Sequence, residues 1–72
     1  AELTAAANAG CVWITKDMRG IAEAFIDIPA YEAPYWNASA DERPMRLFEG
    51  YNWLTPEHGP VLIPDLIEGA GI

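Results

Sequence analysis

Apolar and polar positions near the N-terminus predict one short helix followed by one short strand. Residues 3–9 are rich in alanine and favour a helix, and Gly10 stands where a helix commonly ends. Residues 11–15 read Cys-Val-Trp-Ile-Thr, a β-branched and aromatic run that is typical of a strand. Bulky side chains fall on both faces of this strand, so we expect both faces to be covered.

A helical period predicts a second helix over residues 17–26. Apolar side chains recur in it at the i, i+3, i+4, i+7 spacing that forms one helical face, at Met18, Ile21, Ala22 and Phe25. Thr15 or Asp17 is a suitable N-cap. Pro29 then ends the helix, because a residue that precedes a proline is disfavoured in the α region.

The middle of the chain predicts irregular structure with one further strand. Residues 28–36 form an extended arm in which prolines separate aromatic rings, and residues 39–42 have capping-box spacing for a brief helical turn. Residues 45–54 alternate imperfectly as a strand, with Gly50 marking a bend. Residues 55–60 predict a capped single turn, with Thr55 as N-cap, Pro56 at the first helical position and Gly59 as the exit.

The C-terminal segment 61–72 is an apolar tail, since six of its twelve residues are Val, Leu or Ile. Terminal segments are ordinarily polar and frayed. Six prolines and six glycines leave much of the 72-residue chain to coil. We therefore expect a small single α+β domain over residues 1–72. It should have one or two short helices, two short strands and extensive Pro/Gly-rich coil, and it should pack on a partner chain.

Charge and composition exclude several classes of function. Eleven acidic and four basic residues give a net charge of −7, which repels nucleic acid and anionic membranes. No run approaches the ~18 apolar residues of a membrane span, so we expect no membrane insertion. A single cysteine rules out an internal disulfide, and one cysteine with one histidine cannot make a cysteine-rich zinc site.

Residues with catalytic chemistry are few and scattered. His58 is the one histidine, and it lies in no metal-binding motif. Cys11 has hydrophobic neighbours that favour a buried, inert thiol. Glycine-rich phosphate loops are absent from the sequence. We therefore predict no catalytic residue, no metal ligand and no cofactor.

The surplus of hydrophobic residues predicts protein binding. A domain of this size buries only about 60% of the surface that its unfolded chain exposes, yet 51% of these residues are hydrophobic. Our hypothesis is a non-catalytic small accessory subunit or interaction chain that docks on a larger protein subunit. Aromatic and aliphatic side chains would be its anchors, because such residues dominate interface hot spots. The predicted partner-binding residues are Tyr31, Tyr35, Trp36, Trp53, Leu62, Ile63, Leu66 and Ile67.

Two alternatives belong to other classes. In the first alternative, the chain is the N-terminal fragment of a proteolytically processed heteromeric enzyme. Its candidate site residues are then Glu57, His58, Asp65 and Glu68. A stop codon directly after Ile72 would remove this alternative. In the second it is an acidic inhibitor of a basic protein surface, whose binding should weaken steeply with salt.

Overall fold

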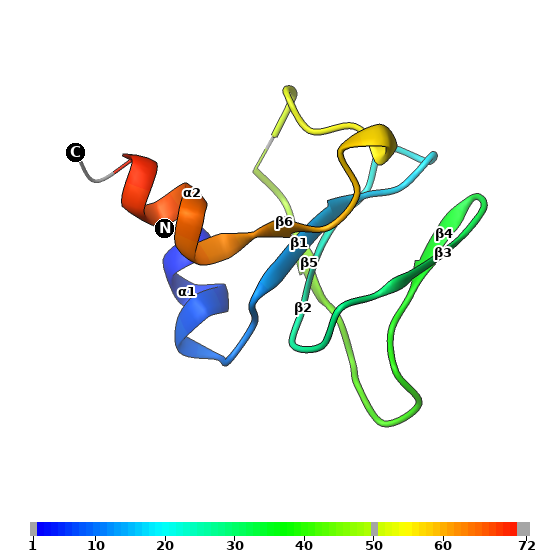
Figure 1. The fold of residues 1–72 in the computed structure, drawn as a ribbon, viewed down its shortest axis with the longest axis horizontal. Helices are drawn as coiled ribbons and strands as arrows, with labels where there is room; N and C mark the ends of the chain where they lie inside the picture. The colour runs from blue at the N-terminus through cyan, green and yellow to red at the C-terminus, as the bar shows by residue number, and fades with distance from the viewer. Residues whose placement is uncertain (1, 50, 71–72) are drawn as a thin grey trace.

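The chain forms a small α+β domain in a computed structural model that describes residues 2–49 and 51–70. Over these residues it has two α-helices, one 3₁₀ helix and six strands in two antiparallel sheets (Figure 1). In chain order these are α1 (Glu2–Asn8), β1 (Trp13–Lys16), β2 (Ala22–Phe25), β3 (Ala30–Glu32), β4 (Tyr35–Asn37), β5 (Met45–Leu47), η1 (Pro56–His58), β6 (Val61–Leu62) and α2 (Ile63–Ala70). Neither α-helix is long and apolar enough to cross a membrane. The prediction of a small α+β domain is thus confirmed, although the described residues contain more strands than the two expected.

The larger sheet has the strand order β5-β2-β1-β6, and all its neighbours are antiparallel. Ile14 in β1 lies opposite Ala24 of β2 and Val61 of β6. The predicted strand near the N-terminus is confirmed as β1. Its adjacent residues Ile14 and Thr15 point to opposite faces and are both buried, as expected for a strand covered on both sides.

The helix predicted over residues 17–26 is wrong, because this segment forms a tight turn and then β2. The Asp17 side chain accepts hydrogen bonds from the backbone N–H groups of Arg19 and Ile21, which gives the backbone an alternative to helical bonding. Gly20 has φ +83°, a left-handed conformation that breaks a right-handed helix. β2 then pairs with β1 on one side and β5 on the other, so tertiary pairing overrides the helical spacing.

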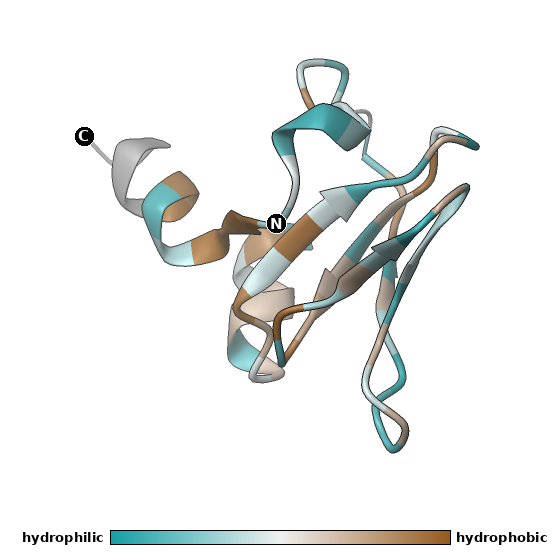
Figure 2. Ribbon diagram, turned by 45° about the vertical axis from the view of Figure 1, so that its right-hand side comes forward, coloured by the Kyte–Doolittle hydropathy of each residue, from teal (hydrophilic) through white to brown (hydrophobic). Residues whose placement is uncertain are grey.

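One face of the sheet packs against both α-helices. The buried cluster joins Ala6 of α1 and Ile63 at the start of α2 to Ile14, Ala22 and Ala24 of the sheet. Figure 2 shows the hydrophobic residues concentrated along the sheet strands and at the beginning of α2.

The opposite face of the sheet buries Thr15 and Phe25, which lie outside that cluster. The hairpin β3–β4 extends on the side of the sheet away from the helices (Figure 1). The proline-flanked segment 28–36 therefore folds largely into a paired hairpin.

Two further predicted segments differ in length or kind. The strand expected over residues 45–54 is confined to β5, and the bend expected at Gly50 lies outside the described residues. The tail predicted over residues 61–72 forms β6 and α2 as far as Ala70. The predicted helix at the N-terminus and the predicted capped turn are confirmed as α1 and η1.

A carboxylate at the start of α1 accepts hydrogen bonds from the segment that follows β5. Glu2 accepts hydrogen bonds from the backbone N–H of Phe48 at 2.6 Å and of Glu49 at 2.7 Å. These two hydrogen bonds hold the pKa of Glu2 below its usual range, and the bond from Glu49 has the larger effect. The Tyr51 hydroxyl also donates to Glu2 at 3.4 Å, and its pKa is raised to about 12, by burial and then by the Glu2 charge.

The lowered pKa of Glu2 predicts a loss of stability in acid. A folded-state pKa below the unfolded value contributes stability above about pH 4, and this stability disappears as the pH falls through the folded pKa. We expect Glu2→Gln to have a lower urea midpoint than the wild type at pH 7. This difference should narrow at pH 3, and a difference that stays constant would contradict the role of the charge.

Candidate functional site

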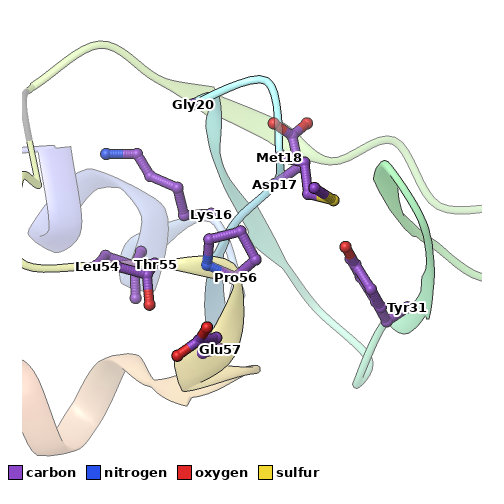
Figure 3. A pocket seen from close by; sticks show the side chains of 9 residues that line it. All are labelled: Lys16, Asp17, Met18, Gly20, Tyr31, Leu54, Thr55, Pro56 and Glu57. Carbon is purple, nitrogen blue, oxygen red and sulfur yellow. The ribbon is translucent and has the colours of Figure 1, made fainter.

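A groove opens where the turn after β1, the hairpin strand β3 and the 3₁₀ helix η1 come together (Figure 3). Its volume is about 660 Å³, within the ~300–1,000 Å³ range of ligand pockets. Apolar groups make up much of its lining, which comprises Lys16, Asp17, Met18, Gly20, Tyr31, Leu54, Thr55, Pro56 and Glu57. The lining comes from three separate segments, so only the folded chain contains this site.

Asp17 holds the first wall of the groove, the turn of residues 17–20. Its carboxylate is 2% exposed and accepts the backbone N–H groups of Arg19 at 2.9 Å and Ile21 at 3.1 Å. The guanidinium of Arg19 also donates to it, at 2.6 Å from Nη2. Burial acts to raise the pKa of Asp17, but these hydrogen bonds, led by that from the Arg19 side chain, outweigh burial and lower it. The charged carboxylate therefore fixes the turn that carries Met18, whose side chain is 65% exposed.

The hairpin β3–β4 forms the second wall and is tied to the same turn. Trp36 Nε1 donates to the Lys16 carbonyl at 3.0 Å, and the Met18 N–H donates to the Pro34 carbonyl at 3.1 Å. The Arg19 guanidinium lies 4.5 Å from the centre of the Tyr35 ring. The hairpin is thus held to the turn by contacts from β4 and from its tip.

Tyr31 is the part of the hairpin that faces the groove. Its ring centre lies 4.8 Å from that of Trp36 with the planes tilted by 48°, and the side chain is 44% exposed. Trp36 supports it from within the fold, so the tyrosine has a rigid backing and an open surface. Figure 3 shows Tyr31 and Glu57 on different sides of the groove.

The 3₁₀ helix η1 supplies the third wall. The Thr55 N–H donates to His58 Nδ1 at 3.1 Å, and Pro56 occupies the first turn as predicted. Gly59, the predicted exit residue, has φ +66°, and a Cβ built there would lie 4.0 Å from the Trp36 ring. Trp53 packs edge-on against His58 at 5.8 Å and is 48% exposed. His58 therefore has a structural role at this turn.

The eight predicted partner-binding residues do not form one surface. Tyr31 lines the groove, Tyr35 and Trp36 hold the hairpin to the neighbouring turn, and Trp53 lies beside η1. The aliphatic residues lie elsewhere: Leu62 is half-buried in β6, Leu66 and Ile67 pack against the core, and Ile63 is fully buried in it. Ile63 is therefore inaccessible to a partner in this conformation.

Sequence reasoning missed Met18, Leu54 and Pro56 as lining residues of the groove. Met18 was assigned to the inner face of a helix, whereas the turn exposes it. The signal that points to the turn is Asp17 followed by Gly20, a spacing that suits an Asx turn with a left-handed exit.

The candidates for catalysis or metal binding do not assemble. Among the described residues, no three His, Cys, Asp or Glu side chains group as a metal site would require. Glu57 lines the groove, whereas Asp65 belongs to α2 and the Glu68 side chain lies outside the described part. Burial, and after it the Glu42 charge, raises the pKa of Cys11, which disfavours the reactive thiolate.

Comparison with known proteins finds no relative of this chain. No family model, no curated protein and no solved structure matches the chain.

Proposed function

We propose that this chain is a non-catalytic small accessory subunit or interaction chain that docks on a larger protein through the groove. The observation that carries the proposal is the exposure of large apolar side chains on a domain that already has a buried core. Exposed apolar side chains that lie close together are typical of interaction sites. Met18 and Tyr31 line the groove, and the exposed Trp53 directly precedes its lining residue Leu54 in the chain.

The construction of the groove favours docking over catalysis. The Asp17 carboxylate in its wall already accepts the hydrogen bonds that hold the turn, so it is not free to act as a base. Tyr31 is backed by Trp36, and Pro56 has a restricted backbone. Tyr31 and Pro56 therefore lose little conformational entropy on binding, which improves affinity.

Site-directed photocrosslinking in the source cells tests the proposal. A photoreactive amino acid at position 18 should crosslink to one larger protein, whereas the same group at exposed position 41 should not. The double variant Met18→Ser and Tyr31→Ser should lower the affinity of the purified pair at least tenfold, with Asp41→Ser as the matched control. Equal affinity of the double variant and the control would reject the groove as the docking site.

The acidic-inhibitor alternative has one observation in its favour, the net charge of −7. Several of these carboxylates, however, already accept hydrogen bonds from the chain itself, among them Glu2, Asp17 and Glu42. Measuring the affinity of the purified pair between 50 and 500 mM salt separates the two functions. A loss of more than a hundredfold would favour the inhibitor, because screening acts on exposed charges.

A further inference from the structure

The charges around the groove are unevenly compensated. Among the side chains that the structure describes, Arg19 and Asp17 form the one ion pair. Lys16 also lines the groove and keeps its positive charge, but its ammonium donates to the Tyr51 carbonyl at 3.0 Å, and Figure 3 shows its side chain directed away from Tyr31. Glu57 lies in the groove lining outside that ion pair, on a chain with a net charge of −7. A cationic group entering beside Tyr31, away from the Lys16 ammonium, would therefore be favoured by both the Glu57 carboxylate and the overall charge.

The exposed Tyr31 ring favours arginine over lysine as the cationic group. Arginine stacks on aromatic rings and pairs with carboxylates through its planar fork, whereas lysine acts as a compact point charge. The same hairpin already holds one such contact, since Arg19 lies over Tyr35 at 4.5 Å. Tyr31 offers a second ring with its outer surface open, and Glu57 lines the same groove.

We propose that the groove takes an extended segment of the partner protein in which an arginine is flanked by apolar residues. The apolar residues would contact Met18 and Pro56, while the guanidinium would stack on Tyr31 and pair with Glu57. This inference rests on the proposed docking function and names the chemistry of the docked segment. The volume of about 660 Å³ accommodates a few side chains, which suits a short segment better than a broad interface.

Peptide binding to the 72-residue chain tests this assignment. The probes are octapeptides with one fixed frame of leucine, proline and glycine, and with arginine, lysine or glutamine at the same central position. Binding is followed through amide NMR shifts of groove residues such as Gly20 and Thr55. We expect the arginine peptide to bind about fivefold more tightly than the glutamine peptide, with lysine between them.

Substitutions test which groove residues cause the tighter binding of the arginine peptide. Glu57→Gln should reduce the arginine advantage to less than twofold, whereas Asp41→Asn, which removes an exposed charge outside the groove lining, should leave it unchanged. Tyr31→Leu should make arginine and lysine equivalent while the glutamine peptide still binds. Salt at 0.5 M should shrink the arginine advantage in the wild type.

Several outcomes would overturn the assignment. These are equal binding of the arginine and glutamine peptides, no binding by any peptide, shifts confined to residues outside the groove, or groove shifts that follow chain concentration because a second copy fills it. Crosslinking from position 18 to a partner together with any of these results would reject the arginine segment and leave the docking function standing. Failure of the crosslinking and partner-affinity measurements would reject the docking function itself.

Discussion

Replacing Phe25 with alanine is expected to destabilise the domain by roughly 3–5 kcal/mol. Phe25 is 0% exposed and lies in β2 on the sheet face that is turned away from the main helical cluster. Removing its ring leaves a cavity on that face, where the much smaller Thr15 is the other buried side chain of the sheet. A domain of 72 residues has a total stability of roughly 4–11 kcal/mol, so much of the variant should be unfolded at 37 °C.

The chain contains a matched control, because Phe48 is 80% exposed. Phe48→Ala should change the free energy of unfolding by less than about 0.5 kcal/mol. Urea unfolding of both variants, followed by far-ultraviolet circular dichroism, measures the difference. Similar midpoints for the two variants would show that β2 does not bury Phe25.

Asp17→Ala is expected to lower stability by roughly 3 kcal/mol, since it strips a buried acceptor from several donors at once. The backbone N–H groups of Arg19 and Ile21 lose their partner, and the Arg19 guanidinium loses its ion pair. The turn of residues 17–20 should then loosen, and the hairpin that bonds to it through Trp36 and Met18 should loosen with it. Tryptophan fluorescence should shift to longer wavelength before global unfolding.

The pH dependence of Asp17→Ala gives an independent check. The pKa of Asp17 is lowered in the folded state, so the stability that its charge contributes is present above about pH 4 and is lost as the pH falls through the folded pKa. The difference in unfolding free energy between wild type and variant should therefore shrink in acid. Asp41→Ala, at an exposed position, should show no such difference at pH 7. An equal loss in both variants would mean that Asp17 does not hold the turn.

Local signals predicted some elements correctly because their causes lie within a few residues. Gly10 adopts φ +96° just after α1, and Thr55, Pro56 and Gly59 occupy the predicted positions around η1. The branched and aromatic run that became β1 is covered on both faces, as its bulk indicates. Each of these depends on capping, turn geometry or strand propensity, which neighbouring residues determine.

The helix predicted over residues 17–26 fails for the opposite reason. Its apolar spacing suits a helix, but a four-residue strand such as β2 has almost no signal of its own. The hydrogen bonds of β2 come from β1 and β5, and the latter lies about twenty residues further along the chain. A preference of a few tenths of a kcal/mol per residue cannot compete with two paired edges.

The amino-acid sequence by itself determined the α+β class, the positions of α1, β1 and η1, the strong negative charge and the surplus of apolar side chains. These depend on composition and on interactions between neighbours. The tertiary structure decided that Ile63 enters the core, that Met18 and Tyr31 stay exposed, and that segments 16–20, 31 and 54–57 meet at one groove. Burial is a property of the packed chain, because it depends on which distant strand or helix covers a side chain, and no local pattern encodes that choice.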